Sequence, residues 1–75
     1  MSPKLPQLNG AQLGRALEKS GFHKVRQKGS HATYKHPDGR RVTISIHPSK
    51  AIPEGTLKGI LRDAGLSIGD LLELL

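Results

Sequence analysis

Hydrophobic positions recur with helical spacing near the start of the chain and with strand spacing in its middle. Asn9 is a residue type that caps helices, and the apolar positions after it are three to four residues apart, as on one face of a helix. Ser20-Gly21 ends this helix, because glycine adopts the left-handed conformation at a helix end at little cost. The apolar positions of this predicted helix are Leu13, Ala16 and Leu17.

Three short segments, residues 22–28, 31–36 and 40–46, follow and are separated by turn residues. Gly29-Ser30 lies between the first two segments, and Pro37-Asp38-Gly39, a strong hairpin signal, lies between the last two. The third segment alternates between apolar and polar residues, as a half-buried strand does. The pattern therefore predicts three strands joined by two tight turns.

The alternation also predicts which side chains share a face of the sheet. Ala32 and Tyr34 are the apolar pair of the second segment, so we expect them to face the helices. The first segment breaks strict alternation at Phe22 and Val25, which leaves the direction of its basic residues open, and a bulge is one explanation. On the opposite, open face we expect His31, Thr33 and Lys35, then Arg41, Thr43 and Ser45, with His47 next in phase.

Two further helical patterns complete the chain. Pro53 suits the first turn of a helix, and Gly65 ends that helix. Ser67 and Asp70 have the spacing of a capping box, which opens a last, leucine-rich helix. The apolar positions are Leu57, Ile60, Leu61 and Ala64 in the first of these helices and Leu71, Leu72, Leu74 and Leu75 in the second.

Together these elements predict an α+β fold, in which helices cover one face of a three-stranded antiparallel sheet and leave the other face open. Seventy-five residues make one domain, residues 1–75, and residues 1–8 show no periodicity, so we expect a loose lead-in there. The chain has no cysteine and no apolar run of the length of a membrane span or signal segment. We therefore expect a cytoplasmic protein with no membrane partner.

The net charge of +6 is unevenly distributed along the chain. Residues 1–50 contain ten lysines and arginines against two acidic residues, a net charge of +8, whereas residues 51–75 carry a net charge of −2. A one-sided basic field on so small a domain favours a polyanionic partner such as nucleic acid. Basic residues also serve simply to keep a small protein soluble, so the charge alone does not decide the matter.

The expected open face combines a histidine with cations, which suits chemistry on a phosphodiester. RNA is cleaved without a metal when the ribose 2′-hydroxyl attacks the adjacent phosphate, and this needs proton transfer near neutral pH and cations beside the phosphorane. Histidine meets the first need, and lysine or arginine meets the second. His31 follows the compact turn at Gly29-Ser30, which lets a phosphate approach, and Lys28 lies three residues earlier. Taken alone, Lys-Gly-Ser-His is more typical of an ordinary hairpin turn with a surface histidine than of a catalytic site.

The other histidines have no such motif around them. His47 is a candidate second proton-transfer or phosphate-binding group at the end of the third strand, or else a residue that caps the loop. His23 and His36 are expected to be exposed. No helical pattern carries a histidine pair at ligand spacing and no carboxylate cluster accompanies the histidines, so we expect neither a metal nor a small-molecule cofactor. Tyr34 is expected in the core rather than stacked on a base.

From about Leu13 to Leu75 the order, spacing and type of residues resemble the HicA family of toxins from bacterial and archaeal toxin–antitoxin modules. The resemblance implies a double-stranded-RNA-binding-domain-like fold (α-β-β-β-α), mRNA interferase activity and a HicB antitoxin that neutralises the toxin by direct binding. It also implies that His31, in the Gly-Ser-His turn, is the catalytic histidine. The matching pieces are residues 17–22, 28–31, 34, 36–40, 42–47 and 55–66.

These observations lead to the hypothesis of a metal-independent endoribonuclease that cleaves mRNA with His31. The second proton-transfer partner stays open among water, Ser30, Lys28 and His47. The alternatives are a non-catalytic RNA-binding module on the same basic face and an interaction protein whose partner is an acidic protein. The residues that we expect to bind RNA are Lys24, Arg26, Lys28, Gly29, Lys35 and Arg41.

Overall fold

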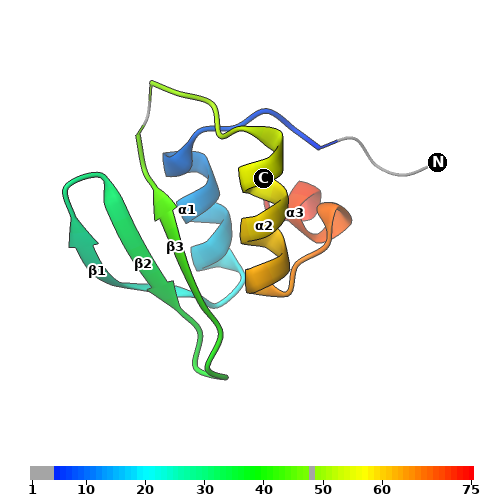
Figure 1. Cartoon of the computed structure of the whole chain (residues 1–75). Coiled ribbons are helices and arrows are strands. Elements are labelled where there is room, and N and C mark those ends of the chain that lie inside the picture. Colours follow the sequence, from blue (N-terminus) through cyan, green and yellow to red (C-terminus); the bar gives the residue numbers. More distant parts are fainter. Residues whose placement is uncertain (1–4, 48) are drawn as a thin grey trace.

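The computed structural model describes residues 5–47 and 49–75. The strands form one antiparallel sheet in the order β1-β2-β3, and the helices lie together on one side of it (Figure 1). This arrangement confirms the predicted α+β, double-stranded-RNA-binding-domain-like fold. Within the described residues, no helix combines the length and apolar character needed to cross a bilayer. The elements are α1 (Gly10–Lys19), β1 (His23–Lys28), β2 (His31–Lys35), β3 (Arg41–Ser45), α2 (Glu54–Ala64) and α3 (Ile68–Leu74).

The core lies between the helices and the sheet, where the apolar stripes of α1 and α2 meet the inward residues of β2 and β3. Every apolar position predicted for α1 and α2 is buried, and so are Ala32 and Tyr34, as expected. Burial raises the pKa of Tyr34, and the Glu18 carboxylate raises it further. Leu8 is a core residue that the hydrophobic pattern does not signal, and its carbonyl accepts a hydrogen bond from the Ile52 N–H at 2.8 Å. The first four residues of the expected lead-in lie outside the described residues.

The helix ends follow the predicted caps. Asn9 accepts a hydrogen bond from the Gln12 N–H at 2.8 Å, and the Gln12 side chain accepts one from the Asn9 N–H at 2.9 Å, which makes a reciprocal capping box. Ser67 and Asp70 form the second box, and the hydrogen bond from the Ser67 N–H lowers the pKa of Asp70. Pro53 is the N-cap residue of α2 and not part of its first turn.

The last helix is less buried than its leucine content predicts. Leu71 is fully buried, but Leu72 and Leu75 are 41% and 55% exposed. A helix of seven residues makes about two turns, and its neighbouring residues point in different directions. Consecutive leucines therefore cannot all face a core that lies on one side of the helix.

Helix α1 lies close to the sheet, against the end of β3 and against Tyr34 of β2, and two of its glycines permit this approach. A Cβ atom added to Gly10 would overlap the Ser45 carbonyl and lie 2.6 Å from the Ile46 Cα. One turn further on, a Cβ at Gly14 would overlap the Tyr34 hydroxyl and lie 3.2 Å from Cζ of that ring. The helix backbone therefore packs directly against the sheet, and it holds the end of β3 at a fixed position.

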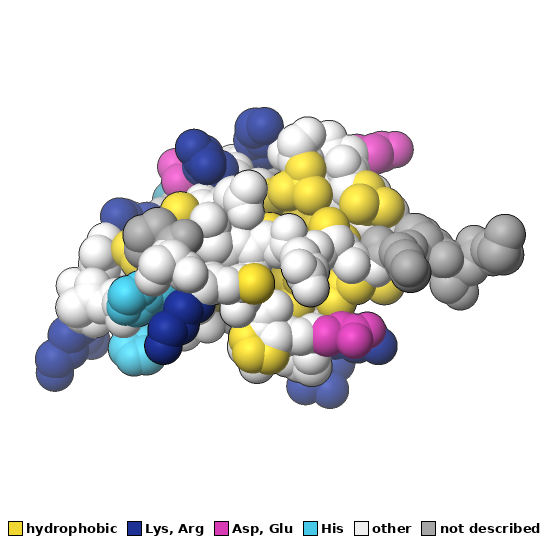
Figure 2. Space-filling view, turned by 90° about the horizontal axis from the view of Figure 1, so that it is seen from above, with side chains coloured by type: hydrophobic (Ala, Val, Ile, Leu, Met, Phe, Trp, Pro, Cys, Tyr) yellow, Lys and Arg dark blue, Asp and Glu magenta, His cyan; other side chains and the backbone are white. Residues whose placement is uncertain are grey.

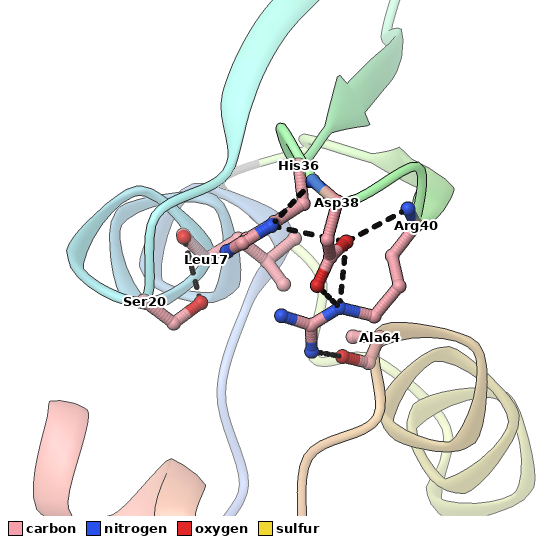
Figure 3. Close-up of polar contacts among 6 residues, drawn as sticks. All are labelled: Leu17, Ser20, His36, Asp38, Arg40 and Ala64. Carbon is pink, nitrogen blue, oxygen red and sulfur yellow. Dashed lines mark hydrogen bonds and ion pairs between the residues drawn. The ribbon is translucent and has the colours of Figure 1, made fainter.

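At the other end of the sheet, away from Ser45, a polar cluster connects the β2–β3 turn to the helices (Figure 3). Arg40 Nε donates to Asp38 Oδ2 at 2.8 Å, its guanidinium lies 5.2 Å from the centre of the Phe22 ring, and its Nη1 donates to the Ala64 carbonyl. The Arg40 N–H also donates to Asp38, and this hydrogen bond is the main cause that lowers the pKa of the Asp38 carboxyl. The turn, Phe22 just before β1 and the end of α2 are thereby joined.

His36 belongs to this cluster, so the expectation that it is exposed is wrong. Its side chain is 21% exposed, and its ring meets the Phe22 ring edge-on with centroids 5.1 Å apart. Its Nδ1 accepts a hydrogen bond from the Asp38 N–H at 3.1 Å. The aromatic contact and the turn place the ring against the core, which residue type alone does not indicate.

We predict that Gly10→Ala lowers the free energy of unfolding by about 1–3 kcal/mol, the usual cost of overpacking, because the added methyl group collides with the backbone of β3. Urea unfolding followed by circular dichroism measures this change. Gly59→Ala is the matched control, since a Cβ there meets no atom within 4 Å and alanine favours the helix by up to about 1 kcal/mol. Equal stability of Gly10→Ala and the unmodified protein would contradict the close approach of α1.

Candidate nucleic-acid interface

The face of the sheet turned away from the helices carries three rows of side chains, because residues opposite each other in antiparallel strands point to the same side. No residue of the three strands is acidic. We call this surface the open face. Its rows are Lys28, His31 and Ser45 beside the β1–β2 turn, Arg26, Thr33 and Thr43 in the middle, and His23, Lys35 and Arg41 at the far end.

The strand pairing places the predicted outward residues of β2 and β3 on the open face and decides the direction of those in β1, but Thr33, in the middle row, is only 8% exposed. The strand pairing shifts between Lys24 and Arg26, which marks the bulge that the broken alternation indicates, and leaves Val25 58% exposed. Arg26 and Lys28 consequently lie on the open face. Lys24 instead lies opposite Tyr34 on the other face, where its Nζ donates to Gln27 Oε1 at 2.8 Å. Of the residues expected to bind RNA, Lys24 is therefore the one separated from the rest.

The turn at Gly29-Ser30 positions the row that contains His31. Gly29 has a φ of +59° and is the first of two residues that link the paired Lys28 and His31, which corresponds to a type II′ hairpin. The Gln27 side chain donates to the Gly29 carbonyl at 3.1 Å and supports the turn. Such a turn matches the twist of the two strands, so it fixes the direction in which the His31 side chain leaves the sheet.

Strand β3 completes this row through Ser45. The Ile46 N–H donates to the Ser30 carbonyl at 2.8 Å, so the next pair along, His31 and Ser45, is a pair without backbone hydrogen bonds between its members. In such pairs the Cα atoms are about 4.5 Å apart and the side chains are closest. Ser45 therefore stands beside His31, on the side opposite to Lys28. The spacing in the sequence gives no sign of this neighbour, because it depends on the register of the β2–β3 hairpin.

The His31 imidazole is available to a ligand. The residue is exposed, and no described residue forms a hydrogen bond or an ion pair with its ring. Ser30 is half-buried, and its carbonyl is engaged by Ile46. His47 lies beyond the end of β3, where its Nδ1 is 3.3 Å from Ser49 Oγ, a contact within the loop.

The other two rows create a surface of uncompensated positive charge. Lys35 lies opposite Arg41 on one side and His23 on the other, and the like charges of Lys35 and Arg41 directly across a strand pair are destabilising. Among the described residues, none of the ion pairs involves a cation of the open face. At the centre, the Thr33 and Thr43 hydroxyls are hydrogen-bonded at 3.2 Å. Figure 2 shows histidines beside lysine or arginine side chains at the strand end of the molecule, whereas hydrophobic side chains gather over the other half.

This arrangement suits a phosphate chain laid across the strands. A polyanion relieves the repulsion between the cations of the open face, and hydroxyls and lysine amines are donors to phosphate oxygens. The His31 imidazole lies within the same surface. In the described part of the chain, histidines and carboxylates do not gather in groups of three or more that could hold a metal ion.

Comparison with known proteins agrees with this geometry. The sequence model of one protein family, described as HicA toxin of bacterial toxin–antitoxin, matches residues 10–66, which extend from the start of α1 to just beyond α2. A search of the curated proteins finds no match.

We predict that Lys35→Gln raises the melting temperature at low ionic strength, because it removes one of two like charges, Lys35 and Arg41, that face each other. The gain should vanish in about 1 M salt, where exposed charges are screened beyond roughly 3 Å. Lys58→Gln is the control, since Lys58 is paired with Glu54 at 3.5 Å and its removal takes away an attraction. Scanning fluorimetry at two salt concentrations tests this, and a salt-independent gain in Lys35→Gln would contradict the explanation.

Proposed function

Since the chain belongs to the HicA family of toxins from bacterial toxin–antitoxin systems, we propose that this toxin is a metal-independent endoribonuclease that cleaves mRNA on its open face. The observation that carries the proposal is the row formed by Lys28, His31 and Ser45. It combines a cation, an unengaged imidazole and a hydroxyl across three strands. The other cations of the open face would hold the RNA on either side of the reacting phosphate.

In the proposed reaction the 2′-hydroxyl of one nucleotide attacks its own 3′-phosphate. The 2′-oxygen loses a proton and bonds to phosphorus, while the bond to the 5′-oxygen of the next nucleotide breaks and that oxygen gains a proton. The products are a 2′,3′-cyclic phosphate and a 5′-hydroxyl. No metal or redox cofactor is needed, because the reaction only moves protons and rearranges the phosphodiester.

Each residue of the row has a role in this proposal. His31 carries one of the two protons, since imidazole exchanges protons near neutral pH. Lys28 lies beside it and stabilises the negative charge that develops on the phosphorane. Ser45 donates to a phosphate oxygen and keeps the phosphate within reach of the imidazole. The partner that handles the other proton is water or one of Ser30, Lys28 and His47.

A toxin of this family has an antitoxin as its partner. We propose that a HicB-like antitoxin binds the open face with acidic side chains and so blocks access to His31. The cations of this face lack acidic partners within the described residues, which favours an acidic partner surface. Inhibition would then be direct competition with RNA for the same charges.

We predict that the purified protein cleaves RNA in EDTA, and that His31→Ala lowers the rate at least 100-fold, within the usual range for losing a general acid or base. The measurement is single-turnover cleavage of end-labelled RNA, with unfolding curves to show that the variant keeps its fold. Binding of RNA carrying 2′-O-methyl groups should persist in His31→Ala. An RNA that the unmodified protein binds but leaves intact would instead establish a non-catalytic binding module.

We also predict that antitoxin binding and RNA binding exclude each other. Addition of the antitoxin should release a fluorescent, uncleavable RNA from the toxin, with a midpoint that rises in proportion to the RNA concentration. A ternary complex of toxin, antitoxin and RNA that still cleaves would contradict direct blocking of the open face.

A further inference from the structure

A cavity of about 300 Å³ lies next to the row of His31, between the end of β3 and the first two turns of α2. This volume is at the lower end of the range in which proteins bind small ligands. A larger hollow of about 500 Å³ shares the segment Ala51–Pro53 but no residue of the open face. The smaller cavity is the one that adjoins the candidate site. Its lining includes Ser45, His47, Lys50, Ile52, Thr56 and Ile60.

Ser45 joins the cavity to the open face. It lines the cavity and is also the cross-strand neighbour of His31. A nucleotide whose phosphate lies between His31 and Ser45 therefore has this cavity within reach of its base. The packing of α1 against the Ser45 backbone holds this connecting residue in place.

The walls of the cavity combine two kinds of surface. Ile60 and Ile52 pack against the core and provide an apolar floor. Thr56, one turn before Ile60 on α2, adds a hydroxyl and a methyl group at the exposed rim, and Lys50 adds a positive charge. A flat aromatic ring with polar edges fits such a surface, because its faces contact the apolar floor and its edge meets the polar rim.

We propose that this cavity binds one nucleobase of the RNA, next to the cleaved phosphate, and that Thr56 at its rim helps to select the base. The inference rests on the proposed ribonuclease function and extends it from phosphate contacts, which carry no sequence information, to a contact that does. Single-stranded RNA is recognised in this way, by bases that leave the stack and enter a pocket. The toxin therefore discriminates between nucleotides at one position beside the cut.

The test uses a set of short single-stranded RNAs in which one abasic nucleotide is moved along the sequence. Each RNA is made in a cleavable form and in a form with 2′-O-methyl groups, for cleavage rates and for dissociation constants. With the unmodified protein, an abasic nucleotide at one position adjacent to the cut should lower the cleavage rate or the affinity about tenfold. Abasic nucleotides at more distant positions should have small effects.

Thr56→Met extends a longer side chain from the rim and narrows the entrance of the cavity, without changing a residue of the open face. In this variant, removing the base at that position should no longer change the rate or the affinity, since the narrowed pocket does not admit a base. Lys58→Met is the matched control, because Lys58 lies on the same helix, is exposed and does not line the cavity. The control removes a positive charge, so a lower affinity without a change in the abasic profile is the expected result. Thr56→Val keeps the shape and removes the hydroxyl, and it should change which base is preferred.

The outcomes separate this inference from the proposed function. Cleavage with a flat abasic profile, the same in Thr56→Met and in the unmodified protein, overturns the nucleobase site and leaves the ribonuclease intact. An abasic effect on binding that disappears in Thr56→Met supports the site even if no RNA is cleaved. If Thr56→Met weakens antitoxin binding and leaves RNA binding and cleavage unchanged, the cavity binds a side chain of the antitoxin. That result also overturns the inference.

Discussion

The close packing of α1 against the end of β3 is the constraint on which the rest of the structure depends. A helix that starts with Gly10 can place its backbone against the Ser45 carbonyl, which no side chain would permit. Gly14 allows the same approach at the Tyr34 ring one turn later. The direct contact between the helix backbone and the strand fixes where the end of β3 lies. The same strand end is hydrogen-bonded from Ile46 to Ser30, in the register that puts Ser45 beside His31.

The two faces of the sheet differ in composition and in what they contact. On one face β2 and β3 supply apolar residues to the core, and the other face combines cations, hydroxyls and histidines with no acidic strand residue among them. A face of this kind lowers the stability of the free protein, since like charges oppose each other at Lys35 and Arg41. The polar cluster at Arg40 and the two capping boxes offset part of that loss at the helix ends and the turn. In a toxin that is paired with an antitoxin, the partner can supply the missing negative charge.

Most of the fold was predictable from the sequence because its signals are local. The caps at Asn9 and Ser67, the Pro37-Asp38-Gly39 turn and the alternation in β3 each depend on a few neighbouring residues. The direction of His31 was predictable for the same reason. Ser45 as the neighbour of His31, the exclusion of Lys24 and the partial burial of His36 were not. The first depends on hairpin register, the second on the bulge at Val25, and the third on a contact with Phe22 that only the folded chain creates.

The central claim is that RNA reacts on the open face, at the row that contains His31. The most direct measurement is a titration of the ¹⁵N-labelled protein with a short RNA whose 2′-hydroxyls are methylated, followed through the backbone amide signals. The account predicts that the largest changes occur at Lys28, His31 and Ser45, spread to the neighbouring rows, and leave the buried part of α3 around Leu71 unchanged. Changes confined to the helices, with the signals of His31 and Ser45 unmoved at saturating RNA, would contradict it.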